Sequence, residues 1–432
     1  MPSAQPLTVA IAGLGTVGAG VMRLLTENAA LIGSRAGRPI QVVAVSARDR
    51  TRNRGVDLGP IAWFGDARAM AREAPAEVFV ELIGGSDGIA RAAVEAALER
   101  GCSVVTANKA LLAHHGGALA RLAEAKGAAL SYEAAVEGGI PAIKTIREGL
   151  AANRIQSVYG ILNGTCNYIL TEMRKSRRAF AEVLAEAQRL GYAEADPAFD
   201  IDGMDTAHKL AILASLAFGA EVNLAGVHVE GIRAMSPIDI DYADELGFRI
   251  KLLGIARRTE HGLEQRVHPA MVPVGASLAH VDGVFNAVVT EGDFVGRTVM
   301  EGRGAGAGPT ASAVVADLID LALGDRRPAF AVPAAELSRA SAAPMDRHRG
   351  AYYVRLMVLD RPGVIADVAA ALRDEEVSME AMLQRGRDPG EAVPVVLTTH
   401  ETEEARMRRA LGRIARLDSV LEPPHMIRIE AI

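Results

Sequence analysis

The chain has 432 residues, half of them hydrophobic, and a formal net charge of −6. This length predicts two or three domains, and the slightly acidic balance gives no reason to expect nucleic acid or an anionic membrane as a partner. The two cysteines suggest neither a disulfide framework nor a metal site, the N-terminus lacks the basic segment of a secretory signal, and no apolar run approaches the roughly 20 residues that span a bilayer. We therefore expect a cytoplasmic protein.

The first segment of the chain predicts a nucleotide-binding turn. LTVAIAGLGTVGAGVMRLLTEN passes from an apolar strand into a helical pattern through Gly13, Gly15 and Gly18, which form G-x-G-x-x-G. In this motif the first glycine permits a tight turn, the second lets the backbone approach a pyrophosphate, and the third allows close helix–strand packing. The turn residues expected to contact the cofactor are Gly13, Leu14, Gly15, Thr16, Val17 and Gly18.

Strand-like and helical segments alternate after this turn. IQVVAVS, VFVELIG and SVVTANK have the composition of strands, and GIARAAVEAALERG and ALLAHHGGALARLAEAKG have that of helices. The alternation predicts an α/β unit with a parallel, doubly wound sheet of the Rossmann type.

The segment VVAVSARDRTRNRG, which follows the second strand, bears on the choice of cofactor. An acidic residue there would bind the ribose 2′-hydroxyl of NAD, whereas an arginine accommodates the 2′-phosphate of NADP. Ser46 and Ala47 occupy the usual acidic position and Arg48 follows them, which favours NADP. NAD stays open, because a shift of register would make Asp49 the ribose ligand.

Two of the few lysines lie in informative surroundings. Only six of the 47 basic residues are lysines, and lysine differs from arginine in that its ammonium can lose a proton near neutral pH when it is desolvated. Lys109 follows a strand, at the sheet edge where ligands bind, and Lys209 begins an almost wholly apolar helix. We expect the two ammonium groups to meet at the cofactor and to lower each other's pKa into the range that proton transfer requires.

A plainer interpretation of the second lysine is local. In DPAFDIDGMDTAHKLAILAS, Asp202 has the position of a helix N-cap, and Asp205 and Lys209 are four residues apart in the favourable order. This interpretation explains the two aspartates, but it does not explain why a lysine lies on the inward face of the helix.

The rest of the chain predicts two further units. Residues 141–325 mix helical and strand-like patterns, as in an α+β domain with an open sheet, and helix 309–324 should pack back on the nucleotide unit. A linker rich in proline, alanine and serine covers residues 326–349. Residues 350–432 have the order βαββαβ, a ferredoxin-like unit whose first turn and helix start could bind a carboxylate.

Six stretches resemble homoserine dehydrogenase in order and spacing: GLGTVG, TANKALL, EAAVEGGIPAIKTIREGL, ILNGTCNYIL, DPAFDIDGMDTAHKLAILAS and GRGAGAGPTASAVVADL. The similarity covers residues 7–325, and the C-terminal part resembles an ACT regulatory domain. The resemblance implies a Rossmann NAD(P) domain over 1–140, a substrate and dimerisation domain over 141–325 and an ACT domain over 350–432. It also implies interconversion of L-homoserine and L-aspartate 4-semialdehyde in the biosynthesis of threonine, isoleucine and methionine. A homodimer or homotetramer, with threonine as the first expected effector, is implied as well.

The same resemblance assigns roles to residues. Lys209 matches the proton donor and acceptor, Lys109 a second lysine near the nicotinamide, and Glu194 the carboxylate that binds the substrate's amino group. Asp200, Asp205, Gly164 and Thr165 match residues of the substrate pocket, and Thr106 and Gly306 are further cofactor contacts. The ligands of a monovalent cation, sodium or potassium, match mainly backbone oxygens of Glu133, Val136, Gly138 and Ile140.

Two positions depart from the family pattern. Cys166 stands where the family loop often has threonine, and we expect it to fill space rather than to act as a nucleophile. Glu137 stands where many members have a small residue, and the extra carboxylate could alter the affinity for the cation.

Other functions have different requirements. Aspartate semialdehyde dehydrogenase would need a nucleophilic cysteine with a histidine partner, and neither Cys102 nor Cys166 has that setting. A nucleotide-binding sensor without turnover would not need Lys109, Lys209 and Glu194. Another semialdehyde oxidoreductase on the same scaffold stays open, as does an ACT unit that dimerises the chain and binds no ligand.

Overall fold

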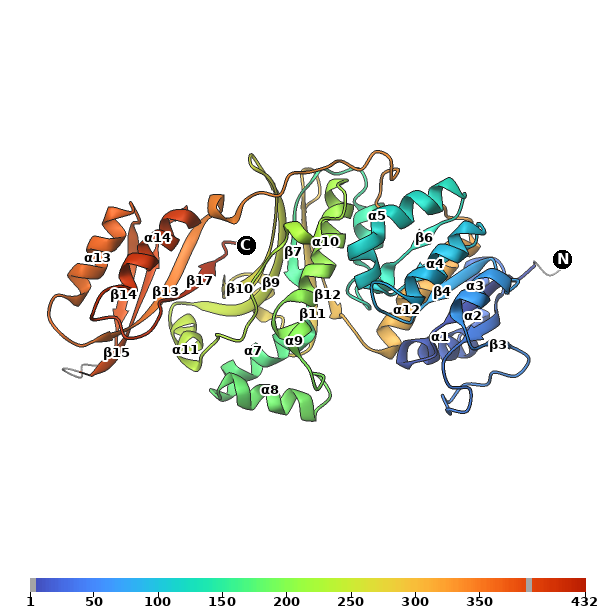
Figure 1. Ribbon diagram of the computed structural model, residues 1–432, viewed down its shortest axis with the longest axis horizontal. Coiled ribbons are helices and arrows are strands. Elements are labelled where there is room, and N and C mark those ends of the chain that lie inside the picture. The colour runs from blue at the N-terminus through green and yellow to red at the C-terminus, as the bar shows by residue number, and fades with distance from the viewer. Residues whose placement is uncertain (1–4, 386–390) are drawn as a thin grey trace.

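The computed structural model describes residues 5–385 and 391–432, which form three units in a row (Figure 1). The nucleotide unit lies at one end, the C-terminal unit at the other, and a sheet with its helices lies between them. Residues that follow α12 (Ala307–Ala322) cross the top of the molecule in Figure 1 and connect the first unit to the last. None of the helices in the described ranges is long and apolar enough to cross a membrane.

The first unit is a six-stranded parallel sheet in the order β3-β2-β1-β4-β5-β6. The predicted Rossmann architecture is confirmed, and the strand order reverses between β1 and β4, where such sheets bind their ligands. Its strands are β1 (Leu7–Ala12), β2 (Ile40–Ser46), β3 (Ala62–Phe64), β4 (Val78–Glu81), β5 (Ser103–Thr106) and β6 (Leu130–Ser131). Its helices are α1 (Thr16–Glu27), α2 (Ala29–Ala36), α3 (Ala67–Glu73), α4 (Ile89–Glu99) and α5 (Lys109–Ala125).

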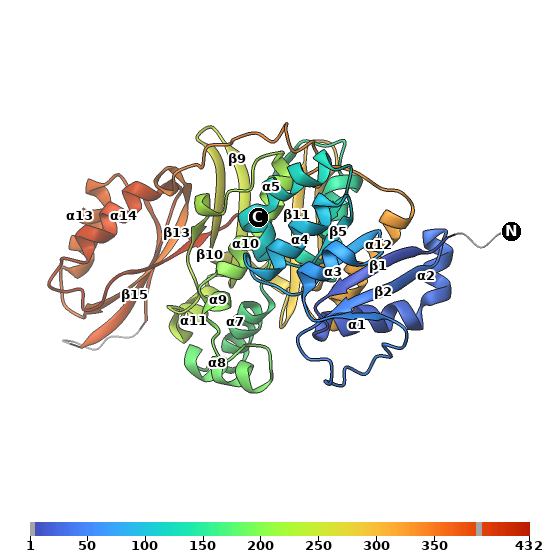
Figure 2. The same ribbon diagram turned by 45° about the vertical axis from the view of Figure 1, so that its right-hand side comes forward.

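Helix α12 joins this unit from far along the chain. It lies against α1 (Figure 1 and Figure 2), and a Cβ atom on Gly20 of α1 would stand 2.9 Å from the carbonyl oxygen of Ala307. Val21 and Leu25 of α1 share a buried cluster with Val314 and Leu318 of α12. A glycine at position 20 therefore lets the two helices approach closely.

The middle unit presents an antiparallel sheet with helices on one side. Its strands are β7 (Ile155–Ile161), β9 (Phe248–Thr259), β10 (Gly262–Pro273), β11 (Phe285–Gly292) and β12 (Gly296–Arg303), and β8 (His228–Val229) pairs with β10. Its helices are α6 (Ala142–Lys144), a π-helix (Thr145–Gly149), α7 (Gly164–Ser176), α8 (Phe180–Arg189), α9 (Ala198–Ile201), α10 (Met204–Phe218) and α11 (Pro237–Glu245). Short 3₁₀ turns lie at Glu133–Ala135, Leu224–Gly226, Ser277–His280 and Met345–Arg347.

The C-terminal unit has the predicted βαββαβ fold, but its sheet is not separate. Its elements are β13 (Arg349–Leu359), α13 (Val364–Asp374), β14 (Met379–Gln384), β15 (Ala392–Thr399), β16 (Thr402–Glu403), α14 (Glu404–Ile414) and β17 (His425–Ile429). The last strand, β17, pairs with β13 on one side and, in parallel, with β10 on the other, through Ala270 with Arg428 and Met271 with Ile429. The middle and C-terminal units thus share one sheet in the order β12-β11-β7-β9-β10-β17-β13-β15-β14.

Candidate active site

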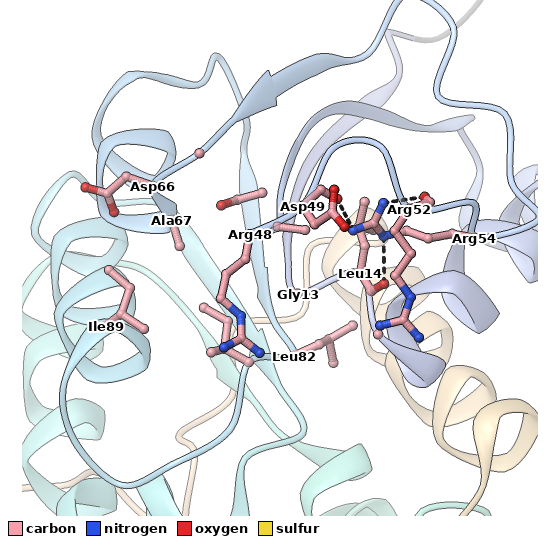
Figure 3. A pocket seen from close by; sticks show the side chains of 15 residues that line it. Gly13, Leu14, Arg48, Asp49, Arg52, Arg54, Asp66, Ala67, Leu82 and Ile89 are labelled. Carbon is pink, nitrogen blue, oxygen red and sulfur yellow. Dashed lines mark hydrogen bonds between the residues drawn. The ribbon is translucent and has the colours of Figure 1, made fainter.

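The glycine turn between β1 and α1 borders a cavity of about 790 Å³ at the switch point of the parallel sheet (Figure 3). Gly13 has a φ of 99°, and a Cβ there would stand 2.4 Å from the carbonyl oxygen of Leu82, so the tight turn requires glycine. At Gly15 a Cβ would meet nothing within 4 Å, whereas at Gly18 it would stand 2.0 Å from the carbonyl oxygen of Gly13. The three glycines have the geometry predicted for pyrophosphate approach and helix–strand packing.

Arginines from the segment after β2 also line this cavity, where the cofactor's ribose is expected. The Arg48 side chain is exposed and extends towards Leu82 in Figure 3. Asp49, the alternative ribose ligand, accepts hydrogen bonds from the backbone N–H of Thr51 (2.8 Å) and from its hydroxyl (2.7 Å). Both bonds use the same oxygen, Oδ1. One of the two carboxylate oxygens of Asp49 is therefore already bound within the turn that Asp49 begins.

A second cavity of about 520 Å³ lies between the nucleotide unit and the middle unit. Val17 and Lys109 line it from the first unit, and Gly306 lines it at the start of α12. Thr165 lines it from α7, where its hydroxyl donates to the carbonyl oxygen of Tyr192 at 2.8 Å. Of the expected substrate residues, Gly164, Thr165, Asp200 and Asp205 line this cavity.

Asp205 joins the two predicted lysines. It lies in the first turn of α10, is 5% exposed, and approaches Lys109 Nζ at 3.1 Å and Lys209 Nζ at 3.3 Å. Asn163 adds a third contact, donating from Nδ2 to Asp205 at 2.9 Å and to Asp200 at 3.0 Å. Burial opposes ionisation, but the two ammonium groups outweigh it and hold the pKa of Asp205 well below its usual range.

Lys209 is charged in this arrangement. Its Nζ donates to the carbonyl oxygen of Leu162 at 2.5 Å and lies 3.0 Å from Oε1 of Glu137, besides its contact with Asp205. Burial alone would lower the pKa of Lys209, but Asp205 and Glu137 raise it above the usual value. The expected lowering of the pKa is therefore wrong for Lys209, because the carboxylates of Asp205 and Glu137 lie beside its ammonium group.

Three expected site residues have surroundings that the sequence did not indicate. Glu194 is exposed on the loop between α8 and α9, and it is absent from the described residues that line the cavity. Thr106 is fully buried, and its hydroxyl donates to Glu81 at 2.6 Å, so its side chain supports the sheet edge and is not free for the cofactor. The carboxylate of Glu133 accepts backbone N–H groups from α6 at 3.0 and 2.7 Å.

The predicted N-cap at Asp202 is wrong. Gly203, with a φ of 87°, precedes α10 and provides no side-chain cap, and Asp202 instead forms an ion pair with Arg233. The local pattern suits a cap, but an arginine from a later loop binds the carboxylate. Cys166 is buried as expected, and burial raises the pKa of its thiol well above the usual value, which does not suit a nucleophile.

Sequence reasoning missed two polar residues of the cavity wall. Asn163 caps α7 through Cys166 N–H at 2.8 Å while its amide group bridges the two aspartates, a double role that only the Asn-Gly-Thr start of a helix could have suggested. Asn286, on β11, donates to Glu137 and is 1% exposed. No local pattern marks this second residue, because its partner is far away in the sequence.

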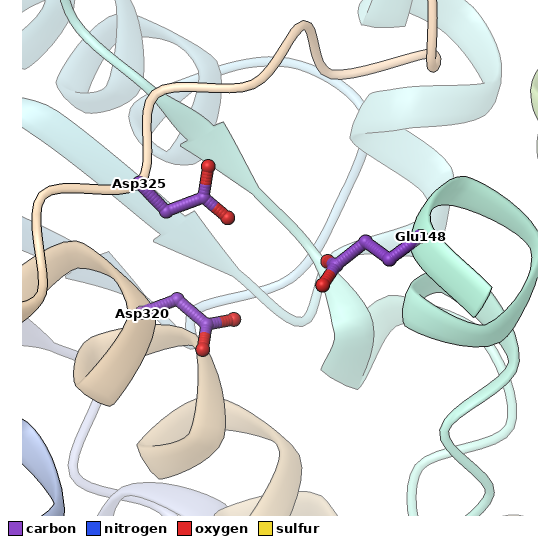
Figure 4. A group of neighbouring side chains, drawn as sticks. All are labelled: Glu148, Asp320 and Asp325. Carbon is purple, nitrogen blue, oxygen red and sulfur yellow. The ribbon is translucent and has the colours of Figure 1, made fainter. Parts of the chain in front are cut away.

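Three carboxylates gather elsewhere, at the junction of the π-helix with the end of α12 (Figure 4). Glu148, Asp320 and Asp325 each offer an oxygen within 4.8 Å of the others. Arg327 pairs with Glu148 at 2.6 Å and with Asp325 at 3.2 Å, and Lys144 pairs with Asp320. These cations neutralise the group, so we interpret it as an ion-pair network that fastens α12 and not as a metal site.

The two cavities together meet the needs of one class of enzyme. A crevice at a Rossmann switch point suits a dinucleotide, and the neighbouring cavity offers a charged lysine that can exchange a proton. The start of α1 separates the two spaces, with Gly15 lining one and Val17 the other. This is the arrangement of an NAD(P)-dependent dehydrogenase, which transfers a hydride and a proton.

Comparison with known proteins narrows the class. The model of the homoserine dehydrogenase family matches residues 141–319, that of its NAD binding domain matches residues 13–133, and that of the ACT domain matches residues 352–418. Homoserine dehydrogenases of Neisseria gonorrhoeae and Pseudomonas aeruginosa are each 46% identical to this chain over 99% of its length and over 99% and 100% of theirs. A homoserine dehydrogenase structure from Thiobacillus denitrificans matches with a TM-score of 0.94, at 46% identity over 99% of this chain and 98% of that one. The chain belongs to the homoserine dehydrogenase family.

Proposed function

We propose that the chain interconverts L-homoserine and L-aspartate 4-semialdehyde, with Lys209 exchanging the proton of the substrate oxygen. One observation carries this assignment: Lys209, Asp205 and Lys109 form a continuous ion-paired row in the cavity beside the nucleotide crevice. The cofactor, when bound, supplies or accepts the hydride. The protonated Lys209 is the form that reduction of the aldehyde requires, because the developing alkoxide takes up a proton as the hydride arrives.

Asp205 keeps Lys209 in place and Lys109 near the substrate. The Asp205 carboxylate lies between the two ammonium groups, 3.1 Å from Lys109 Nζ and 3.3 Å from Lys209 Nζ, so it reduces the repulsion between them. Asp200 and Glu194 are the proposed partners of the substrate's own ammonium group. Asp200 lines the cavity, and Glu194 lies on the loop whose neighbours Gly191 and Tyr192 line it.

For the cofactor we propose NADP as the preferred form. Arg48 lines the cavity and forms no ion pair within the described part of the chain, whereas Asp49 is partly engaged by Thr51. Replacing Arg48 with alanine should lower kcat/KM for NADP by about 10-fold or more, the effect of one charge-assisted contact, and should leave NAD nearly unchanged. An unchanged ratio of the two cofactors would contradict this assignment.

We propose a monovalent cation at segment 133–140, with sodium and potassium both open. The carbonyl oxygens of Val136 and Gly138, both in buried residues, accept no hydrogen bond from the described part of the chain, and such oxygens suit a hard cation. Glu133 and Ile140 fit less well, because their carbonyl oxygens already accept the N–H groups of Val136 at 3.5 Å and of Ala142 at 2.7 Å. When bound, the ion would hold this loop in place through the attraction between its charge and the carbonyl oxygens.

The remaining proposals concern organisation. We propose domains at 1–140, 141–325 and 350–432 with a linker at 326–349, a homodimer or homotetramer, and threonine as the effector of the ACT domain. A cytoplasmic location accords with a nucleotide cofactor and two buried, unpaired cysteines. The two sheets support the division into domains. The shared strand β17, which joins the ACT unit to the middle unit, supports the position proposed for the ACT domain.

The proposal is tested by following reduction of NADP with L-homoserine, L-serine and L-threonine as substrates. Lys209→Ala should lower kcat for homoserine by about 10²- to 10⁴-fold while binding of NADP survives. Lys251→Met is the matched control, because Lys251 is another buried lysine, bound to Val281, Asn167 and Asp282 and absent from the described lining of the cavity. Wild-type activity in Lys209→Ala would overturn the acid–base assignment.

A further inference from the structure

Glu137 has an unusual backbone conformation for a buried side chain. Its φ is 61°, in the left-handed region, which is unfavourable for a residue with a Cβ because the Cβ lies too close to the following carbonyl oxygen. The other described non-glycine residues with positive φ are Arg177, Ala331 and Glu376, and all three are exposed, whereas Glu137 is 1% exposed. Strain of this kind persists where the surroundings hold the residue firmly.

The Glu137 carboxylate connects three separate segments. One oxygen lies 3.0 Å from Lys209 Nζ on α10, and the other accepts a hydrogen bond from Asn286 on β11. The loop that leads to α12 passes close by, because a Cβ on Gly304 would stand 2.1 Å from Asn286 Nδ2 and 2.7 Å from Glu137 Oε2. A side chain at position 304 would therefore displace this contact.

Lys209 has three N–H donors, and the protein surrounds its Nζ with three oxygen partners. Nζ donates a hydrogen bond to the carbonyl oxygen of Leu162 at 2.5 Å and forms ion pairs with Glu137 at 3.0 Å and with Asp205 at 3.3 Å. Asp205 divides its carboxylate among Lys209, Lys109 and Asn163. Among the described residues, Glu137 is thus the carboxylate that pairs with Lys209 and with no other cation.

We infer that Glu137 is a positioning residue, which holds the Lys209 ammonium at the cavity wall so that one N–H can turn to the substrate oxygen. The contact with Asp205 is the longest of the three, and Asp205 also binds Lys109 and Asn163. A substrate oxygen can therefore replace this contact. Leu162 and Glu137 then keep the nitrogen in place. This inference rests on the proposed function, because it acts through Lys209 as the proton donor.

Glu137→Gly tests the inference, because glycine adopts a φ of 61° without strain and removes the carboxylate. We expect kcat for homoserine to fall by about 10- to 100-fold, as a misplaced reacting group would cause, while KM for homoserine and Kd for NADP change by less than about threefold. Formate, which fits the space left by the carboxylate, should restore part of kcat, and chloride at equal ionic strength should not. A purely structural role would lower the midpoint of unfolding and leave kcat of the folded enzyme unchanged.

Two further variants sharpen the test. Glu376→Gly makes the same replacement at an exposed left-handed glutamate of the ACT domain and should leave kcat unchanged. In a Lys209→Ala background, Glu137→Gly should add no further loss, because Glu137 acts through Lys209. If Glu137→Gly fails to fold, Glu137→Gln replaces it, since an amide cannot accept from both Lys209 and Asn286 and should also lower kcat.

The outcomes separate this inference from the proposed function. A kcat within about twofold of wild type in a folded Glu137 variant, or an added loss in the Lys209→Ala background, overturns the inference and leaves Lys209 as the acid. Full activity in Lys209→Ala overturns both. Loss of kcat with rescue by formate supports the positioning role.

Discussion

Two buried groups of charged residues in this protein differ in what surrounds them. The pocket cluster, formed by Lys109, Glu137, Asp205 and Lys209, lines a cavity of about 520 Å³. The junction network lies where β10, β17 and β13 meet, and it contains Glu230, Glu264, Arg266, His268, His348, Glu404, Arg428 and Glu430. Charges in the first group face space for a ligand, whereas those in the second face one another.

The junction network satisfies its donors internally. Arg428, which is 1% exposed, donates to Glu230 at 2.7 and 2.9 Å and to Glu404 at 2.8 Å, and the fully buried Arg266 donates to Glu264 at 2.9 Å and to Glu430 at 3.1 Å. Two residue pairs join β17 to β10, and these ion pairs add to the contacts that hold the ACT unit against the middle unit. This difference indicates that the pocket cluster is needed for activity, whereas the junction network holds the middle unit and the ACT unit together.

The largest expected effect breaks the pocket cluster. Asp205→Asn should lower kcat/KM for homoserine by about 10²- to 10⁴-fold, because two neighbouring ammonium groups lose the carboxylate that separates them. Steady-state kinetics, with thermal unfolding measured in parallel, checks this result. Near-normal kinetics in a folded variant would mean that Asp205 only stabilises the helix end.

The next effect breaks the junction network. Arg428→Met leaves the Glu230 and Glu404 carboxylates without their main partner and should cost about 3–5 kcal/mol in the free energy of unfolding, with kcat changed less than about twofold. Urea denaturation measures the loss. Arg121→Met is the control, because Arg121 pairs with Glu221 in a partly exposed bridge and should cost less than about 1 kcal/mol. A large loss of kcat without loss of stability would show that the network also serves catalysis.

A smaller effect depends on pH. Burial, with Arg428 and Arg266, lowers the pKa of His268 well below its usual value, so the folded state keeps this imidazole neutral while the unfolded state binds a proton below about pH 6.5. Stability should therefore fall as pH falls below that value, by up to about 1.4 kcal/mol per pH unit for this group. His268→Gln should make the dependence shallower between pH 6.5 and 5, as urea denaturation at a series of pH values can show.

The carboxylates of the junction network act in a lower pH window. Burial alone would raise the pKa of Glu264, but hydrogen bonds from His348 and Arg266 outweigh burial and hold this pKa below its usual range. Such a group stabilises the fold fully above its unfolded pKa of about 4.3, and this stabilisation is lost as pH falls towards the folded pKa. The His268 effect is thus separable, because it begins about two pH units higher.

The smallest expected effect concerns the Asp202–Arg233 pair, which lies outside both groups. Its side chains are 44% and 53% exposed, so Asp202→Ala should change the free energy of unfolding by no more than about 0.5 kcal/mol. A true N-cap would cost about 1 kcal/mol. A loss of that size or more in thermal unfolding would restore the capping interpretation.

The sequence predicted the features that depend on local pattern. The glycine turn, the strand–helix alternation and the βαββαβ tail are confirmed because each follows from spacing within a short segment. The row of Lys109, Asp205 and Lys209 was expected in outline, since a buried lysine needs a partner. The charge state of Lys209 was not expected, because its partner Glu137 belongs to a segment 72 residues earlier in the chain. The shared sheet was missed for the same reason, as two residue pairs between β10 and β17 leave no periodic signal.

Helix α12 has a consequence for the order in which the protein is made. The apolar face of α1 is covered by residues near position 314, so this face stays uncovered after all the strands of the N-terminal sheet have left the ribosome. Synthesis must proceed through the whole middle unit before this surface is closed. During that interval Val21 and Leu25 are available to wrong partners, and a chaperone that recognises apolar helices should associate with nascent chains that end before α12.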